Sequence, residues 1–301
     1  MRGFPLTSLN NSAYYKLDLW KTWLSQVSNH MKILDGKKIA EKILEGIREE
    51  IKEKQLKLSL AVVSVGEESL FKAFVRQKEK ACKKAGIDFN LFKFPEIISK
   101  EDFKKEVEKI IEGNSGIVIQ LPLPENLKDV FNIVPQKKDP DVLSEESKEK
   151  FERGELPVLP PVVCAVNHLL KEYNISLKGK NIVLAGKGKL VGKPLSVWLL
   201  NKGIDFSIVD KSTENPVSFF KKADIIISGA GKADLIRGRM VKEGVIIIDA
   251  GTSLKKGKLV GDVDFESVSK KASYITPVPG GVGPLTVACL FENLIKLNSA
   301  N

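Results

Sequence analysis

The sequence predicts an α/β protein with parallel sheets in two domains, and three observations support this fold class. Short, almost uniformly apolar segments alternate with amphipathic segments of helical period along most of the chain. Strands that are apolar throughout are typical of parallel sheets covered by helices on both faces. A chain of 301 residues with 43% hydrophobic content can bury two cores, and a charged stretch near residues 140–156 marks the boundary between them.

The first half supplies three strands and the helices between them. "LSLAVVSVG" and "GIVIQ" are apolar strands, and a serine at the start of "SKEDFKKEVEKIIEGN" is a typical helix cap. In chain order we expect a helix at 40–54, a strand at 58–66, a helix at 69–86, a strand at 88–94, a helix at 99–114 and a strand at 116–120.

The second half continues the same alternation and ends in an unusual loop. Its strands are "KNIVLAG", "DFSIVD", "ADIIISGAG" and "GVIIIDAG", followed by a short strand at 273–276 and a last helix at 285–297. The loop "ITPVPGGVGPLT" between these last two elements combines three prolines with three glycines. Because proline restricts φ and glycine lets another group approach closely, we expect a rigid loop whose backbone amides face a bound group.

Composition excludes several classes of protein. The net charge of +10 comes almost entirely from lysines, which alternate with glutamates on helix faces, so we expect a solvated surface and no nucleic-acid partner. No apolar run approaches the ~20 residues of a membrane span. The three cysteines (Cys82, Cys164 and Cys289) are widely spaced, which indicates a reducing, cytoplasmic setting without disulfides. With only two histidines, His30 and His168, we expect no metal site.

Residues 1–30 differ from the rest of the chain. They are rich in serine, asparagine and aromatic residues, and the strand–helix rhythm begins only at Met31. They have neither the repeated arginines of a transit peptide nor the apolar core of a signal peptide. We therefore expect this leader to be an extension outside the fold, with Met31 as the natural start.

A glycine-rich turn in the second half predicts a nucleotide site. "VLAGKGKLVGKP" places Gly186, Gly188 and Gly192 between a strand and a helix. This resembles a dinucleotide-binding turn with one extra residue, in which glycines let the backbone reach a diphosphate at the helix N-terminus. Asp210 ends the next strand, where an acid that binds the ribose belongs. The alternative is an ordinary tight turn.

Polar residues in the first half are candidates for chemistry. Lys78 falls within the apolar stripe of its helix, so its side chain either snorkels to solvent or is held for catalysis with a lowered pKa. Gln120 ends a parallel strand, where open α/β sheets bind ligands, although it can equally cap a loop. Asp139 and Asp141 in "QKKDPDV" are by default turn formers.

These segments together resemble a known family. "ILDGKKIAEKI", "GIVIQLPLP", "KDPD", "GDVDF" and "ITPVPGGVGPLT" are similar to methylenetetrahydrofolate dehydrogenase/cyclohydrolase, and the resemblance covers residues 31–298. It implies a folate-binding catalytic domain at 31–148, completed by the last helix at 284–298. It also implies a Rossmann-like NAD(P)-binding domain at 149–283, a cleft between the two domains, and a homodimer.

The resemblance also assigns roles. Lys78 matches the catalytic lysine, Gln120 its partner and Asp141 the acid that binds the pterin edge, while Phe74 covers the folate ring. The loop at Pro279, Gly280 and Gly281 lines the junction of folate and nicotinamide. The expected cofactor residues are Gly186, Lys187, Gly188, Gly192, Asp210, Lys211, Gly229 and Thr252. The family mostly uses NADP, whose 2′-phosphate Lys187 or Lys211 can receive, whereas an Asp210 bound to the ribose 2′-hydroxyl suits NAD.

Four departures from the family pattern keep alternatives open. Phe74 replaces a usual tyrosine, Val142 a glycine, Val162–Val163 a Thr-Pro pair, and Gly188 a serine. Together these departures bear on the cyclohydrolase reaction more than on hydride transfer. The alternatives are therefore an NAD-dependent dehydrogenase without cyclohydrolase activity, and a non-catalytic folate- or nucleotide-binding relative.

Overall fold

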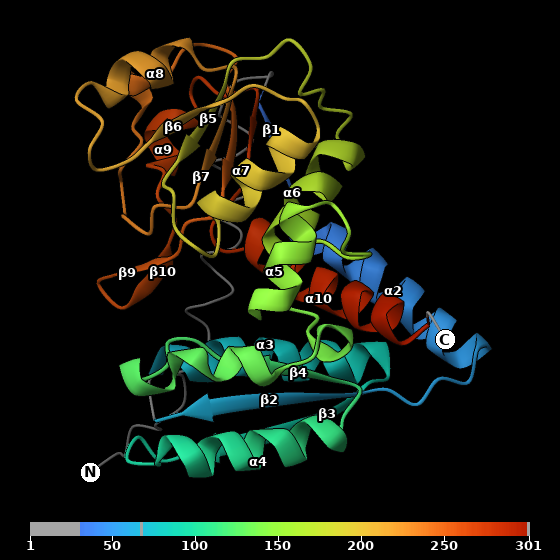
Figure 1. Cartoon of the computed structure of the whole chain (residues 1–301). Helices are drawn as coiled ribbons and strands as arrows, with labels where there is room; N and C mark the ends of the chain where they lie inside the picture. The colour runs from blue at the N-terminus through green and yellow to red at the C-terminus, as the bar shows by residue number, and fades with distance from the viewer. Residues whose placement is uncertain (1–30, 67–68, 300–301) are drawn as a thin grey trace, which may run out of the picture.

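The computed structural model describes residues 31–66 and 69–299, without the side chains of residues 69–73. The predicted leader, residues 1–30, lies outside this part of the chain. Figure 1 shows two α/β units, each built on its own parallel sheet, with helices between them. These two units are called layers below. The helices are α2 (Gly36–Glu53), α3 (Ser69–Ala85), α4 (Lys100–Glu112), α5 (Glu145–Glu152), α6 (Pro161–Glu172), α7 (Gly192–Asn201), α8 (Pro216–Lys222), α9 (Phe265–Val268) and α10 (Val282–Asn298).

The smaller sheet lies at the bottom of Figure 1, between α3 and α4. It consists of β2 (Ser59–Val65), β3 (Asp88–Phe94) and β4 (Gly116–Ile119), which pair in parallel in the order β3-β2-β4. The central strand β2 is buried along almost its whole length, as its apolar sequence predicts. The Ser99 side chain caps α4 by accepting a hydrogen bond from the Asp102 amide at 3.1 Å, which confirms the predicted helix start.

The larger sheet lies at the top of Figure 1 and is parallel throughout. Within the described residues it has the order β1-β11-β8-β7-β5-β6. Its strands are β1 (Lys32–Ile33), β5 (Ile182–Ala185), β6 (Ser207–Val209), β7 (Ile225–Ser228), β8 (Ile246–Asp249) and β11 (Tyr274–Ile275). Because β1 pairs with β11, the first described strand belongs to this sheet, although residues 32–33 fall within the range 31–148 expected for the folate-binding domain.

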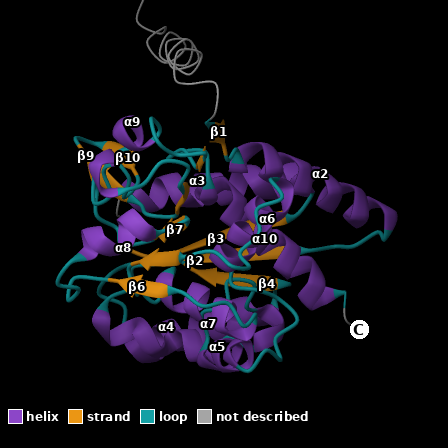
Figure 2. Cartoon of the chain, turned by 90° about the horizontal axis from the view of Figure 1, so that it is seen from above, coloured by secondary structure: helices purple, strands orange, loops and turns teal. Residues whose placement is uncertain are grey.

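The last helix joins the two layers. α10 packs against α2, α6 and α3, and Figure 2 shows it lying beside α6. The buried Asn293 side chain donates hydrogen bonds to the Pro140 carbonyl at 2.9 Å and to the Leu159 carbonyl at 2.7 Å. These bonds hold the segment that links the two layers against α10. In the described part of the chain, no helix has both the length and the apolar character needed to cross a bilayer.

A short hairpin was not predicted. β9 (Ser253–Lys255) and β10 (Lys258–Val260) pair antiparallel beyond the carboxyl end of β8. Their sequences are short and rich in lysine, so no apolar pattern marks them as strands. The 3₁₀ helices η1 (Glu125–Ile133), η2 (Gln136–Lys138) and η3 (Gly238–Met240) complete the described elements.

Candidate active site

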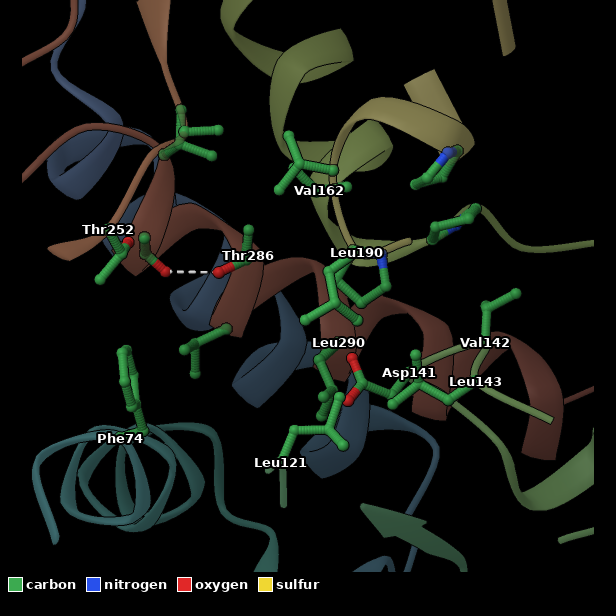
Figure 3. Close-up of a pocket in the computed structure, with 18 of the residues that line it drawn as sticks. Phe74, Leu121, Asp141, Val142, Leu143, Val162, Leu190, Thr252, Thr286 and Leu290 are labelled. Atoms are coloured by element: carbon green, nitrogen blue, oxygen red, sulfur yellow. Dashed lines mark hydrogen bonds between the residues drawn. The ribbon is translucent and has the colours of Figure 1, made fainter. Parts of the chain in front are cut away.

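A cleft of about 340 Å³ lies between the two layers. Its floor comes from α3, the end of β4 and the Asp141 loop, and its other walls come from the N-terminal parts of α6, α7 and α10. The Phe74, Leu121, Asp141, Val162 and Leu290 side chains are drawn around it in Figure 3. Mostly apolar walls with a few convergent polar groups are typical of a pocket for an organic substrate.

Lys78 and Gln120 form a pair on one wall of the cleft. The Lys78 Nζ donates a hydrogen bond to the Gln120 Oε1 at 2.9 Å, and the Gln120 Nε2 donates to the Leu121 carbonyl at 3.0 Å. Burial lowers the pKa of the Lys78 ammonium, while the charge of Asp141 opposes this shift. Of the two interpretations left open by the sequence, the structure therefore supports a lysine held inside the cleft rather than one that snorkels to solvent.

Asp141 faces the same cleft from a loop that Asp139 holds in place. The buried Asp139 carboxylate accepts hydrogen bonds from the Leu143 and Ser144 amides at 3.0 and 2.9 Å, and from the Ser144 hydroxyl at 2.8 Å. Asp139 is thus the turn former, whereas Asp141 is free to meet a ligand. Burial raises the pKa of the Asp141 carboxyl to about 6, although the nearby Lys78 charge lowers it.

Val142 has an unusual backbone conformation beside Asp141. Its φ of 57° lies in the left-handed region, which a β-branched residue rarely adopts. Its side chain is nonetheless buried and lines the cleft. This backbone conformation favours glycine, which the family resemblance leads us to expect at this position. Valine therefore occupies it under strain.

Phe74 and the proline- and glycine-rich loop form the opposite end of the cleft. The Phe74 ring rises from α3 into the pocket in Figure 3. Pro279, Gly280 and Gly281 line the pocket together with Thr252. The Gly281 amide donates to the Pro277 carbonyl at 2.8 Å, and the Gly280 carbonyl accepts from the Lys37 amide at 2.9 Å. The loop is shaped as predicted, but at least one of its amides is used inside the loop rather than facing a ligand.

The predicted dinucleotide turn borders the cleft without lining it. Gly186 has a φ of 101°, which favours glycine. A Cβ added to Gly192 would lie 2.2 Å from the Gly186 carbonyl oxygen, so only glycine allows α7 to start this close to the turn. Among the described residues no side chain caps the α7 N-terminus. The next residues, Lys189 to Val191, do line the cleft. This arrangement fits the diphosphate of a dinucleotide.

Asp210 lies at the end of β6 with two partners. Its Oδ2 is 2.5 Å from the Lys187 Nζ, and its Oδ1 accepts hydrogen bonds from the Ser212 amide at 2.8 Å and the Ser212 hydroxyl at 2.6 Å. The Lys187 ammonium and Ser212 hold the pKa of the Asp210 carboxyl well below its usual range. Lys211 is exposed beside this group. The charge of Asp210 is thus compensated by Lys187.

Sequence reasoning missed two buried acids beneath the cofactor loops. Asp262 accepts hydrogen bonds from the Ala230 and Lys232 amides at 2.6 and 2.7 Å, and Asp249 accepts from the Gly251 and Val263 amides at 2.9 Å each. Burial and the neighbouring Asp262 raise the pKa of Asp249 to about 6. The two acids shape the loops that carry Gly229 and Thr252. The "GDVDF" segment was a local signal for Asp262, but nothing in it indicated the partners.

The chain matches a known family over most of its length. Residues 34–141 match the catalytic domain of tetrahydrofolate dehydrogenase/cyclohydrolase, and residues 160–301 match its NAD(P)-binding domain. The chain belongs to the tetrahydrofolate dehydrogenase/cyclohydrolase family. The cleft with Lys78, Gln120 and Asp141 therefore lies at the junction of the two domains of this family, and the second domain binds NAD(P).

Solved and curated members of the family agree with this assignment. The bifunctional protein FolD of Hydrogenobaculum is 42% identical over 272 residues, which are 88% of this chain and 98% of that protein. The bifunctional FolD enzyme of Campylobacter jejuni has a TM-score of 0.84 at 39% identity and covers 89% of this chain and 99% of its own. The FolD enzyme of Trypanosoma brucei, solved with NADP and an inhibitor, has a TM-score of 0.85 at 29% identity and covers 90% and 98%.

Proposed function

We propose that this member of the tetrahydrofolate dehydrogenase/cyclohydrolase family catalyses both reactions in its name. It oxidises methylene-tetrahydrofolate to methenyl-tetrahydrofolate with NAD(P), and it hydrolyses the methenyl product to formyl-tetrahydrofolate, in one-carbon metabolism. The observation that carries the proposal is the meeting of Lys78, Gln120 and Asp141 in one cleft that borders a dinucleotide turn. Relatives that are about 40% identical along nearly their whole length are named as bifunctional.

Substrate binding follows from the groups around the cleft. The Asp141 carboxylate can accept paired hydrogen bonds from the amino group and ring nitrogen of the pterin. The Phe74 ring covers the aromatic part of the folate, because stacking requires the face of a ring and no hydroxyl. The loop at Pro279 to Gly281 holds the reacting carbon close to the nicotinamide, and bound NAD(P) supplies the hydride acceptor.

The charge of Lys78 is the central element of the chemistry. Loss of hydride makes the folate a cation, and a fixed ammonium next to it would oppose that charge. Because burial lowers the Lys78 pKa, a larger fraction of Lys78 is in the neutral amine form. A neutral Nζ, held by the Gln120 Oε1, accepts a proton from the water that attacks the methenyl carbon. Lys78 is thus the proposed catalytic base, and Gln120 positions it.

We propose NADP as the cofactor. The Asp210 carboxylate would repel a 2′-phosphate if its charge were uncompensated, but Lys187 is paired with it, and Lys211 adds a further positive charge. If Asp210 instead accepts a ribose 2′-hydroxyl, NAD is preferred. The ratio of kcat/KM for the two cofactors, measured for the wild type and for Asp210→Asn, decides between them. A strong wild-type preference for NAD that the variant loses would contradict the NADP proposal.

We also propose a homodimer formed through the cofactor-binding domain. β6 is an edge strand of the larger sheet, and Ile208 on it and Phe219 on α8 are large apolar side chains that are 41% and 39% exposed. Unpaired strand edges and exposed apolar groups are typical of association surfaces. Light scattering should give the mass of two chains, and Ile208→Lys should shift it toward one. The cytoplasmic location stays a prediction from the sequence.

The test of the bifunctional proposal follows both products in one preparation. Methylene-tetrahydrofolate is supplied with NADP or NAD, and NAD(P)H formation and methenyl decay are recorded for the wild type, Lys78→Met and Lys80→Met. Lys80 is an exposed lysine on the same helix, so it is a matched control. We expect Lys78→Met to lose hydrolysis by roughly 100-fold or more while folate still binds, and Lys80→Met to be unchanged.

Three outcomes would contradict parts of this proposal. Hydrolysis at the wild-type rate in Lys78→Met would remove its catalytic role. Accumulation of methenyl-tetrahydrofolate by the wild type would show that cyclohydrolase activity has been lost. Absence of NAD(P)H formation with either cofactor, in a protein that still binds folate, would favour a non-catalytic relative.

A further inference from the structure

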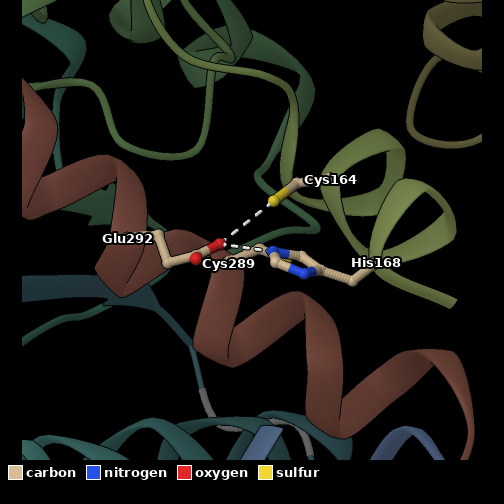
Figure 4. Close-up of side chains that lie close together, drawn as sticks. All are labelled: Cys164, His168, Cys289 and Glu292. Carbon is tan, nitrogen blue, oxygen red and sulfur yellow. Dashed lines mark hydrogen bonds and ion pairs between the residues drawn. The ribbon is translucent and has the colours of Figure 1, made fainter. Parts of the chain in front are cut away.

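Four metal-binding side chains meet behind the cleft, between α6 and α10. Cys164 and His168 lie one helical turn apart on α6, and Cys289 and Glu292 lie one turn apart on α10 (Figure 4). Residues at these spacings project from the same face of a helix. Because α6 and α10 pack against each other, the two pairs point into one space. Among the described residues that line the cleft, none belongs to this cluster.

The distances within the cluster fit one small cation. The four ligand atoms all lie within 4.8 Å of one another. The His168 Nε2 is 2.8 Å from the Glu292 Oε2, and the Cys164 Sγ is 3.3 Å from the same oxygen. A tetrahedral zinc site, with Zn–N of about 2.0 Å and Zn–S of about 2.3 Å, has ligand atoms roughly 3.3–3.8 Å apart. The separations of 2.8 and 3.3 Å are close to this range, so small movements of the side chains would admit the ion.

We propose that Cys164, His168, Cys289 and Glu292 bind one zinc ion. Two thiolates and an imidazole favour zinc over magnesium or calcium, which prefer oxygen ligands. On binding, each thiol loses its proton to solvent, and the His168 ring loses the Nε2 proton that faces the Glu292 carboxylate. The imidazole then donates a lone pair from this nitrogen, and the carboxylate donates an oxygen. The site then carries three ligand anions against two positive charges. Lys296, one turn beyond Glu292 on α10, adds a positive charge near this carboxylate.

The burial of the four residues indicates a structural role with access from one side. Cys164 and Cys289 are buried, whereas the His168 and Glu292 side chains are 29% and 21% exposed. A metal ion can therefore enter past His168 and Glu292 and reach the thiolates below. Four protein ligands leave no open position for a substrate, which is typical of structural zinc sites.

Zinc at this site would hold together α6 and α10, two helices that form walls of the cleft. Val162 on α6 and Thr286 and Leu290 on α10 line the cleft, close to Cys164 and Cys289 in the sequence. Zinc bound between the helices would fix these walls relative to each other. The expectation of no metal site followed from the presence of only two histidines. The local sequence does not reveal the cluster, because its two pairs of side chains come from helices that are far apart in the chain.

The test uses the full chain, reduced, freed of metal with a chelator and desalted. Zinc content is measured after addition of zinc chloride, and cobalt chloride is added separately as a spectroscopic probe. The variants are Cys164→Ala/Cys289→Ala and, as a control, Cys82→Ala, which alters the third cysteine, buried in α3. We expect one zinc per chain, a thiolate-to-cobalt charge-transfer band and a melting temperature raised by zinc. All three should be present in the wild type and the control and absent from the double variant.

A second variant distinguishes loss of the zinc ligands from misfolding of the double cysteine variant. His168→Gln changes a side chain that is 29% exposed, so the chain should fold. Zinc affinity should fall by more than the roughly 10–100-fold that is lost when a residue hydrogen-bonded to a ligand is removed. Equal zinc binding by the wild type and both cluster variants, or a cobalt spectrum without a thiolate band, would overturn the proposal. So would a Cys164–Cys289 disulfide in protein purified without reductant, if the reduced protein binds no zinc. These readouts do not depend on folate turnover.

Discussion

Serine substitutions at two glycines of the dinucleotide turn test how that turn works. Gly188 and Gly192 are in the same segment, but their surroundings differ. A Cβ on Gly188 would have its nearest neighbour, the Gly229 carbonyl oxygen, 4.0 Å away, and the φ of Gly188 is outside the left-handed region. A Cβ on Gly192 would lie 2.2 Å from the Gly186 carbonyl oxygen and 2.7 Å from the Lys187 Cα, both backbone atoms.

These distances predict opposite results for the two variants. In Gly188→Ser the side chain enters open space, so the free energy of unfolding should change by less than about 0.5 kcal/mol. The hydroxyl can donate to a phosphate, and a hydrogen bond to a charged group contributes about 1.5 kcal/mol or more, which is roughly tenfold in KM for the cofactor. In Gly192→Ser the turn itself must move, which costs roughly 1–3 kcal/mol or more.

The assay combines thermal unfolding with cofactor kinetics. For a chain of this size, each kcal/mol lowers the melting temperature by roughly 2–4 °C. We expect Gly192→Ser to melt lower by several degrees and to lose cofactor affinity, while Gly188→Ser melts like the wild type and has a lower KM for the cofactor. If Gly192→Ser keeps both its melting temperature and its KM, the close approach of α7 to Gly186 does not constrain the turn, and the reasoning fails.

Three further predictions concern the folate side of the cleft. Phe74→Tyr adds one oxygen near Lys78 and should raise the hydrolysis rate several-fold, since complete acid–base assistance is worth roughly 100-fold or more. A flat or lower rate in a folded protein would point instead to Val162 and Val163. Because the Asp141 pKa is raised to about 6, its carboxylate is lost as the pH falls through that value, so KM for folate should rise below about pH 6. In Asp141→Asn this pH dependence should disappear, and its persistence would assign the titration to another group. Val142→Gly relieves a left-handed φ worth about 1–2 kcal/mol, but it also removes a buried side chain worth about 1.5–3 kcal/mol. Denaturant unfolding should therefore show a small net loss of stability, and a gain would mean that the strain at Val142 is larger than this.

Local sequence patterns were sufficient to predict most of the helices and strands and the dinucleotide turn. The apolar runs at β2 and β7, the Ser99 cap and the glycines before α7 all express interactions between residues near each other in the chain. Asp141 was by default a turn former in the local pattern, and only the family resemblance assigned it to the pterin. Lys78 was ambiguous, because a lysine in an apolar stripe can point either way until its neighbours are known.

The tertiary structure decided what depends on contacts between distant segments. The pairing of β1 with β11 and the hydrogen bond from Lys78 to Gln120 join segments that are distant in the chain, and neither local sequence identifies the other as its partner. The same is true of Asp249 beside Asp262, and of the Cys164 and Cys289 pairs on α6 and α10. Periodicity reports which face of an element is apolar, but not which face of another element will cover it. From its sequence, this protein could be predicted as two α/β domains with a dinucleotide turn. Packing of α10 against α2, α3 and α6 then determined which polar side chains share a cleft and which share a buried cluster.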